Sequence, residues 1–483
     1  MNRFILLASA LLAGCAVGPD YVAPAIHWPA QWQSAGDTGS QSITEKAPVL
    51  DRWWQHFHDP LLNRLLELAR TDNPGLGIAY ARIDQARAEW RANRADLFPR
   101  AGANVAALGT DNFLTRSMQS QSQSQGVGAL FLTGFDAIWE IDLFGRLHRK
   151  LEAADAHTAQ SMEAYRQEWV VLAAEIARVY TQYRNIQAQE RITQSNLEVQ
   201  QKTLALTHAL FQEGMGNRFD VERAAAEVEG TAAALPLLQG QLAGFEFQLE
   251  QLLGMKPGGL HVRLAQPAAV PFAEAPELLL SRPSETLRLR PDILAAEKRL
   301  MAATATQGAA LAELFPKVSI AAFAGFQNSD LENLFRSTAF SWASGSAIMQ
   351  PVFNFGRIRA GIDLADARQR EALLAYEESV LRALQEAETA MAQWLKEAQR
   401  CRKLEQSVQH LQEALTLADL RYREGVSAFL DVLDAQRILY VEEVELAEAR
   451  ARTTLYLIAL YKALGGDGQI PLPVMKEPLR PWG

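Results

Sequence analysis

This sequence of 483 residues has few cysteines, no excess of positive charge and few long apolar runs. With two cysteines, Cys15 and Cys401, the chain cannot build a framework of several disulfides. The formal net charge is −9, and no basic patch carries interleaved aromatic residues, so we do not expect a nucleic-acid partner. Beyond the N-terminus no apolar run approaches the roughly 18 residues of a membrane helix, which excludes a helical span.

Groups of residues that carry chemistry are also missing. We find no Ser/His/Asp arrangement, no phosphate-binding loop and no zinc motif in the sequence. The two histidines of HFHDP, His56 and His58, are the nearest approach to a metal site, and we interpret them as packing or solvent-exposed histidines. The sequence therefore predicts no enzyme, no cofactor and no metal.

The N-terminus, MNRFILLASALLAGC, has the pattern of a secretory signal. Its apolar run, Phe4 to Ala13, is too short to span a bilayer, so we assign residues 1–14 to a signal peptide. Leu12-Ala13-Gly14-Cys15 resembles a bacterial lipobox, in which the cysteine becomes the lipidated first residue. The alternative is an ordinary buried or reactive thiol. Ala16 stands where an aspartate would suggest retention at the inner membrane, so outer-membrane lipid is the expected partner of the acyl chains.

A tandem repeat dominates the rest of the chain. LFQEGMGNRFDVERAA at residues 210–225 returns as RYREGVSAFLDVLDAQ at 421–436, an offset of 211 (425 minus 214). The same offset relates the FGR at 144–146 to that at 355–357. The LFP at 97–99 returns at 314–316 with an offset of 217 (316 minus 99), so repeat one has six extra residues, near residue 120. We expect two similar halves folded into one body.

Each repeat contains a long predicted helix with a heptad seam. Apolar residues alternate three and four apart from Met162 to Ile186, and the seam returns from Leu373 to Tyr422 with Cys401 inside it as a packing residue. The later part of the first seam is more polar, at Glu190, Thr193, Gln200 and Thr207.

The first long helix is expected over about 146–213, on the order of 100 Å. Further helices over 219–253 and 428–464 follow glycine turns at Gly214 and Gly425, so each repeat should form a helical hairpin.

Strands are predicted between the helices. Pro99 and Pro316 end the helices that precede them. Residues 127–141 alternate, with one apolar side and Asp136 and Glu140 on the other. The segments 101–110, 317–327 and 340–351 complete four strands. Four strands cannot close a wide barrel, and lipid tolerates no open sheet edge, so several chains must share one barrel.

Several motifs together resemble the TolC-like family of outer-membrane efflux channels, and within it the NodT-type lipoproteins. The likeness covers nearly the whole chain. It rests on Cys15, the GPDYVAP segment after it, the Trp53-Trp54, Phe57 and Asp59-Pro60 pattern, both LFP and FGR pairs and both glycine tips.

The resemblance implies an α+β membrane protein. Three chains would form a homotrimer whose twelve-stranded β-barrel, four strands per chain, continues as a long α-helical barrel in the periplasm, with a mixed equatorial domain. The implied layout after the signal peptide is a lipidated equatorial segment (15–60), repeat one (61–254), a proline-rich equatorial linker (255–284), repeat two (285–465) and an equatorial tail (466–483).

The resemblance also implies a function. The channel would be the exit duct of a tripartite efflux pump of the RND type, docked to a periplasmic adaptor protein and powered by an inner-membrane transporter. It would passively conduct drugs or other small toxic molecules out of the periplasm. The residues that match family positions are the periplasmic gate (Asp431, Asp434), the adaptor-docking tips (Gly214, Met215, Gly216, Gly425, Val426, Ser427) and the strand–helix junctions (Pro99, Gly145, Pro316, Gly356).

Alternatives remain open for the gate and for the function. Asp431 fits a helix first turn equally well, because its repeat mate is Asp220; the mate of Asp434 is Arg223, which favours a pore role for Asp434. We expect Arg421, Arg423 or Arg437 to contact the carboxylates. The channel could instead serve type I protein secretion, or the chain could be a structural coiled-coil lipoprotein of the periplasm, which would have no use for strands with aromatic faces.

Overall fold

The structure is a computed structural model that describes residues 16–26, 28–34, 50–110, 128–271 and 283–472. The chain divides into two compact units. The first, called the strand unit here, takes the segments up to Ala25, Arg82–Ser161 and Ala295–Tyr376, and the second, the hairpin unit, takes the rest. Each unit draws on both halves of the tandem repeat, so neither unit is a single repeat.

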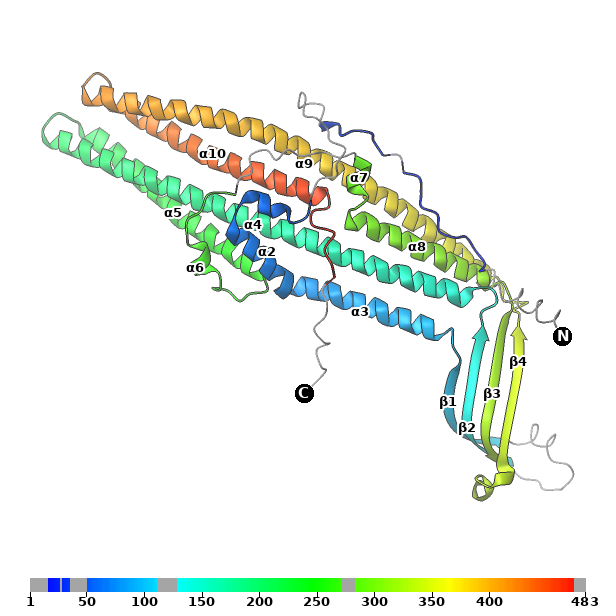
Figure 1. Cartoon of the computed structure of the whole chain (residues 1–483). Coiled ribbons are helices and arrows are strands. Elements are labelled where there is room, and N and C mark those ends of the chain that lie inside the picture. Colours follow the sequence, from blue (N-terminus) through cyan, green and yellow to red (C-terminus); the bar gives the residue numbers. More distant parts are fainter. Residues whose placement is uncertain (1–15, 27, 35–49, 111–127, 272–282, 473–483) are drawn as a thin grey trace. The chain divides into compact units, whose positions relative to one another are not determined.

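The strand unit contains one antiparallel sheet with the order β1-β2-β3-β4 (Figure 1). The strands are Arg100–Thr110 (β1), Gly128–Ile141 (β2), Lys317–Asn328 (β3) and Phe340–Met349 (β4), which confirms the four predicted strands to within two residues at each end. The last strand ends before Pro351, which has no N–H to donate to a ladder.

The register of the sheet sorts its side chains into two faces. Residues directly opposite each other share a face, and Phe135 lies opposite both Ala103 and Ala324. All four charged residues of the strands fall on the other face: Arg100, Asp136, Glu140 and Lys317. The uncharged face carries the large aromatic residues Phe131, Phe135, Trp139, Phe326, Phe340 and Trp342. One face of the sheet therefore holds its charged residues, acidic on β2 and basic on β1 and β3. Phe323 also lies on that face, opposite Asp136.

Four helices flank the strands in the chain. α3 (Pro74–Ala95) precedes β1 and α8 (Pro291–Ala312) precedes β3, so each helix ends four residues before the predicted terminators Pro99 and Pro316. α4 (Arg146–Gln212) follows β2 and α9 (Arg357–Arg423) follows β4, and each has 67 residues. The predicted long helices are thus confirmed.

The heptad seam of α4 is buried as predicted. Trp169, Ile176 and Val179 are at most 1% exposed. The buried stripe is wider than the seam, however, because Ala173, Ala177 and Tyr180 are buried as well. α4 therefore packs against neighbours on more than one side.

Cys401 lies in the seam of α9 and is 2% exposed. It packs with Val408 of α9 and with Leu446 and Ala449 of α10, and burial raises the pKa of its thiol. The prediction of a packing cysteine is confirmed.

Both helical hairpins are present in the hairpin unit (Figure 1). α5 (Arg218–Leu252) follows α4, and α10 (Phe429–Ala463) follows α9. The turns have the same geometry, since Gly214 and Gly425 have φ of 74° and 72° and the amide after each glycine donates to the carbonyl five residues back, at 2.9 Å. These left-handed glycines confirm the predicted helix ends.

Short elements pack against the helices of the hairpin unit: η2 (Trp53–Phe57), α2 (Pro60–Asp72), α6 (His261–Leu264) and α7 (Pro283–Leu287). Trp53 stacks on Tyr461 of α10 at 5.0 Å between ring centroids. Asp59 caps α2 by accepting from the amides of Leu61 and Leu62, and it also accepts from the Tyr180 hydroxyl at 2.6 Å. The tryptophan and Asp-Pro pattern thus fixes this segment to the helices.

Two 3-10 turns, η3 (Leu331–Asn333) and η4 (Ser337–Ala339), connect β3 to β4. Among the described helices, none combines the length and the apolar character needed to cross a bilayer.

Candidate functional site

The two predicted gate carboxylates lie at the beginning of α10. The helix starts at Phe429 after the extended residue Ala428, whose side chain cannot cap it. Asp431 is in the first turn and its amide donates to the Ala428 carbonyl at 3.1 Å. A carboxylate there interacts favourably with the free helix amides. Asp434 lies one turn further on, where this effect fades, so the capping alternative applies to Asp431 alone.

The corresponding helix α5 begins differently. Asn217 caps it, accepting from the Asp220 amide at 2.8 Å. Asp220 is therefore next to a proper cap, whereas Asp431 is at an uncapped end. The two aspartates occupy equivalent positions in the two repeats but do not have the same structural role.

One of the three arginines expected near the gate reaches a gate carboxylate within the described chain. Arg437 lies 3.6 Å from Asp434, with side chains 66% and 50% exposed. Arg423 instead pairs with Asp419 at 2.8 Å, and no contact of the Arg421 side chain with Asp431 or Asp434 is found among the described residues. Exposed pairs of this kind contribute little on their own, on the order of 0–1 kcal/mol.

Beside the carboxylates, an apolar cluster joins all four helices of the two hairpins. It contains the buried residues Ala224 (α5), Phe429 and Leu433 (α10), with Leu204 (α4) and Tyr422 (α9) packed against them. The rings of Tyr422 and Phe429 are 5.3 Å apart. Burial, followed by the charge of Asp220, raises the pKa of Tyr422.

Beyond this cluster, towards the C-terminus of α10, polar contacts join α4 to α10; they are called the polar seam here. The Thr193 and Tyr440 hydroxyls share a hydrogen bond at 3.1 Å, and Gln436 donates to Thr203 at 3.2 Å. Gln200 is also buried, and the side-chain oxygens of Gln200 and Gln436 have no hydrogen-bond partner in the described structure. Buried polar atoms without partners weaken an interface.

The two repeats differ at this seam. Thr193, Gln200 and Thr207 are buried polar residues seven apart on α4. Their mates 211 residues later are Leu404, Leu411 and Ala418, so the second repeat has an apolar seam at the same positions. The same heptad positions are therefore polar on α4 and apolar on α9.

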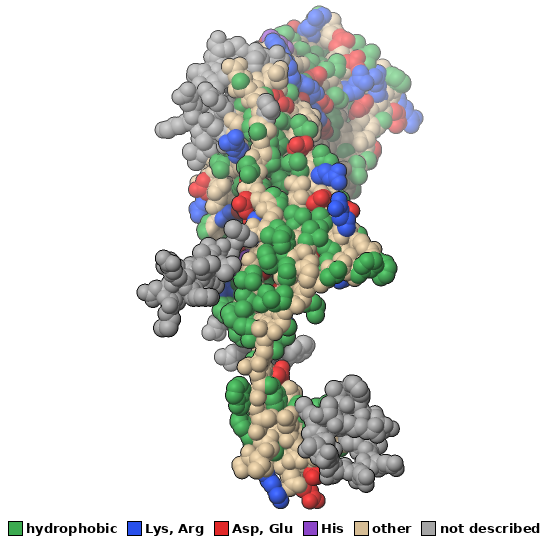
Figure 2. Space-filling model, turned by 90° about the vertical axis from the view of Figure 1, so that its right-hand side faces the viewer, with side chains coloured by type: hydrophobic (Ala, Val, Ile, Leu, Met, Phe, Trp, Pro, Cys, Tyr) green, Lys and Arg blue, Asp and Glu red, His purple; other side chains and the backbone are tan. Residues whose placement is uncertain are grey.

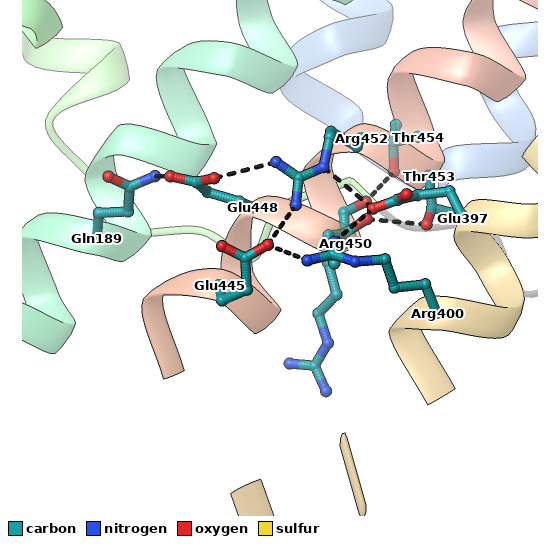
Figure 3. A network of polar contacts seen from close by, with 10 residues as sticks. Gln189, Glu397, Arg400, Glu445, Glu448, Arg450, Arg452, Thr453 and Thr454 are labelled. Carbon is teal, nitrogen blue, oxygen red and sulfur yellow. Dashed lines mark hydrogen bonds and ion pairs between the residues drawn. The ribbon is translucent and has the colours of Figure 1, made fainter. Parts of the chain in front are cut away.

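Further along α10, an ionic network connects it to α9 and α4 (Figure 3). Arg452 lies 3.0 Å from each of Glu397 (α9), Glu445 and Glu448, and Arg400 (α9) contacts Glu397 and Glu445. The hydrogen bond from Arg400 holds the pKa of Glu445 below its usual range, although partial burial opposes this. The network thus links α10 to α9 through several charged contacts, and Gln189 of α4 joins it by donating to Glu448 at 3.4 Å.

The predicted docking tips are exposed. Met215 is 72% exposed and Val426 is 65% exposed. A Cβ added at Gly214 or Gly425 would meet nothing within 4 Å, so only the left-handed backbone demands glycine there. Gly216 is tighter, with Phe211 N 3.1 Å from an added Cβ, and the Ser427 hydroxyl is buried without a partner in the described structure.

The predicted strand–helix junctions lie in the strand unit. Gly145 and Gly356 have φ of 76° and 82° just before α4 and α9. A Cβ added at Gly145 would lie 2.7 Å from the Cα of Ala16, whereas a Cβ added at Gly356 would meet nothing within 4 Å. Pro99 and Pro316 each stand one residue before a strand.

The residues that follow Cys15 bind at the strand–helix junction around Gly145. Val17 N donates to the Phe144 carbonyl at 3.1 Å. Arg149, 4% exposed, donates to the carbonyls of Val17 and Gly18 and pairs with Asp20 at 2.8 Å. Cys15 itself lies outside the described residues. Sequence reasoning missed Arg149, although the GPDYVAP segment that it binds was conspicuous.

A buried carboxylate in the hairpin unit was also missed. Asp467 lines a cavity of about 550 Å³ together with Asp51, Arg52 and Arg70. Trp169 donates to it at 3.2 Å, and burial together with the neighbouring Asp51 raises its pKa to about 6. Nothing in the local sequence GGDG signals this, because the partners come from distant segments.

Comparison with known proteins adds the family context. The family model described as "outer membrane efflux protein" matches residues 65–255 and 282–466. The chain is 32% identical to the solvent efflux pump outer membrane protein SrpC of Pseudomonas putida, over 96% of this chain and 98% of the relative. It is 30% identical to the cation efflux system protein CusC of Escherichia coli, over 95% and 97%. The solved outer-membrane channel OprN is 35% identical, with a TM-score of 0.85, over 94% of this chain and 99% of that chain.

Proposed function

This chain belongs to the outer membrane efflux protein family, and on that premise we propose which cargo it conducts and which residues control the flow. It is an outer-membrane channel of a tripartite efflux pump. Three copies contribute four strands each to one twelve-stranded barrel, and the helices continue it as a tube in the periplasm. The trimer works with a periplasmic adaptor and an inner-membrane transporter.

The cargo we propose is small toxic molecules, of the drug or solvent kind. The observation that supports this is the likeness over 96% of the chain to a solvent efflux channel. A cation efflux protein is almost as similar, so one fold accompanies different cargoes. Selection therefore belongs to the transporter, and this chain conducts passively without catalysing a reaction.

We propose the beginning of α10 as the periplasmic gate. Asp431 and Asp434 of three chains would place six carboxylates around the threefold axis. In a confined, low-dielectric opening their repulsion and their attraction for cations are both strengthened. The exposed position of Asp434 beside Arg437 supports this assignment. Proton uptake by such a ring is coupled and belongs to the set rather than to one residue.

Two attachment sites complete the proposal. The exposed tips at residues 214–216 and 425–427 are the docking sites for the adaptor. Cys15 carries acyl chains in the outer membrane, and its position next to the segment fixed by Arg149 supports this. The equatorial layout inferred from the sequence, with residues 15–60, 255–284 and 466–483 around the two repeats, is part of the same proposal.

A complementation experiment tests the cargo. The gene is expressed with its adaptor and transporter in a strain that lacks its own efflux channels, and the minimal inhibitory concentrations of several antibiotics and solvents are measured. We expect them to rise only when all three proteins are present. Unchanged tolerance with restored export of a type I secreted protein would overturn the small-molecule proposal in favour of protein secretion.

A further inference from the structure

The charged face of the sheet has one carboxylate without a counterion. Three of the charged strand residues have ion-pair partners outside the strands: Arg100 with Asp96, Glu140 with Arg146 and Lys317 with Glu313. The fourth, Asp136 of β2, has no ion-pair partner among the described residues. Figure 2, with the right-hand side of Figure 1 facing the viewer, shows mostly hydrophobic and uncharged side chains along the strand region, and charged side chains at its far end. Asp136 is therefore available to a cation from outside the sheet.

The charged face lines the interior of the barrel. Each chain contributes four strands to a closed barrel in the outer membrane, and charged side chains that face lipid destabilise such a barrel. The face that carries Phe135 and Trp342 therefore contacts lipid, and Asp136 faces the water-filled lumen. Threefold symmetry places three copies of Asp136 on the lumen wall.

Asn104 of β1 lies beside Asp136 and has an unused acceptor. Its amide nitrogen donates to Asp136 Oδ1 at 2.9 Å. Its amide oxygen is buried and has no hydrogen-bond partner in the described structure. A buried acceptor without a partner is costly, and an N–H donor bound to it would remove that cost. The residue as a whole is partly exposed, so a small rotation of the amide presents this oxygen to the lumen.

An aromatic ring lies next to the carboxylate. Phe323 of β3 is directly opposite Asp136 and is the only aromatic residue on this face of the described strands. Its ring covers two glycines that are opposite each other in the ladder, since a Cβ added at Gly134 would lie 3.0 Å from Phe323 Cε2 and one added at Gly325 would lie 2.9 Å from Cζ. The ring thus lies along the wall, partly exposed to the lumen.

We propose that Asp136, Asn104 and Phe323 form a transit site for aromatic organic cations, present three times on the wall of the barrel. The carboxylate attracts the positive charge, the Asn104 amide oxygen accepts from an N–H group of the cargo, and the Phe323 ring packs against its aromatic part. This inference rests on the proposed export of small toxic molecules and names one chemical class among them.

The transit site slows such cargo without trapping it. A single carboxylate in a water-filled lumen is hydrated and screened by salt, so inorganic cations gain little from it. A cation with an aromatic part also gains the ring contact, which increases the affinity about two- to fivefold at an exposed site. Weak binding suits a channel, because bound cargo must leave again.

Current blockades in single channels test the transit site. The background is the double variant Asp431→Asn with Asp434→Asn, so that the proposed gate does not hold the probe. Ethidium, an aromatic cation with two amino groups, is added at the extracellular side. Asp136→Asn and Phe323→Leu, each introduced into this background, should shorten the ethidium blockades about two- to fivefold. Both substitutions change the size of the side chain little, and the trimers are compared at equal open-channel conductance.

Matched variants separate the transit site from the general charge and packing of the barrel. Glu140→Gln removes a carboxylate from the same face of β2, where Arg146 already pairs with it, and Phe326→Leu removes an aromatic residue from the opposite face of β3. Neither should change the duration of the ethidium blockades. Fluorescein, an aromatic anion, should give blockades of equal duration with and without Asp136→Asn.

Two different failures can be distinguished. Ethidium blockades of unchanged duration in Asp136→Asn and Phe323→Leu, or equal shortening by Glu140→Gln, would overturn the transit site while the channel itself still conducts. Background trimers that conduct no current would contradict the proposed function, and the transit site with it.

Discussion

The hydroxyl groups of Thr193 on α4 and Tyr440 on α10 lie 3.1 Å apart and share a hydrogen bond. Thr193 is 1% exposed, and the bond is partly buried within the polar seam between the two hairpins. A neutral hydrogen bond of this kind contributes about 1 kcal/mol. The seam therefore contributes little to holding α10, and its loss should favour opening of the proposed gate.

Removing that hydroxyl should make the channel leak. Tyr440→Phe loses the bond and leaves Thr193 unpaired, so we expect about a fivefold increase in the open population, from about 1 kcal/mol. The measurement is uptake of a large hydrophilic antibiotic by intact cells at equal trimer abundance. Tyr456→Phe is the control, because no hydrogen bond of its hydroxyl is found among the described residues. Equal uptake in wild type and Tyr440→Phe would show that the seam does not restrain the gate.

Lipidation is tested by labelling. Radiolabelled palmitate should enter the wild-type protein and not Cys15→Ser. The trimer should still form in this variant, because the barrel has its own affinity for the membrane. Label retained in Cys15→Ser would end the lipoprotein assignment.

The proposed docking role of the tips should depend on the bulk of the side chain rather than on backbone conformation. Gly425 has φ of 72°, a conformation that asparagine tolerates better than other residues with a Cβ. Gly425→Asn should thus keep antibiotic resistance, whereas Gly425→Trp should abolish it at unchanged trimer abundance, because the indole prevents close approach of the adaptor. Resistance at the wild-type level in Gly425→Trp would place docking elsewhere.

Asp467 predicts a pH dependence of stability. Its pKa is raised from the usual 3.8 to about 6 in the folded protein, so the native state binds more protons than the unfolded state between these values. The free energy of unfolding should therefore fall as the pH rises from about 4 to about 6. Asp467→Asn cannot ionise and still accepts from Trp169. Calorimetry should show a smaller drop in melting temperature from pH 4.5 to pH 7.5 in this variant; an equal drop would contradict the account.

Periodic and repeated features of the fold were predictable from the sequence. The heptad seam from Met162 predicted α4, because a regular apolar stripe indicates a helix. The repeated glycines at Gly214 and Gly425 predicted both hairpins, because a left-handed glycine ends a helix. The polar residues at Thr193, Gln200 and Thr207 were visible too. Their burial was not, because it depends on which neighbouring helices cover them.

Contacts between distant segments were not predictable. Arg149 meets Asp20 across 129 residues, and Asp467 meets Trp169 across 298. Neither pair has a local signature, so burial and pKa at these positions emerge only from the folded chain. Of the arginines expected at the gate, Arg437 was placed correctly one turn from Asp434, whereas Arg423 follows its nearer neighbour Asp419.

Single-channel conductance in planar bilayers is the most direct test of a gated channel. Wild type should conduct, select cations and be blocked by divalent or trivalent cations, since six carboxylates would line the narrow opening. The double variant Asp431→Asn with Asp434→Asn should still conduct but lose both the selectivity and the block. Selectivity and block equal to those of wild type would place these aspartates away from the pore and leave Asp431 as a helix-end residue, and an absence of any conductance from wild-type trimers would contradict the channel itself.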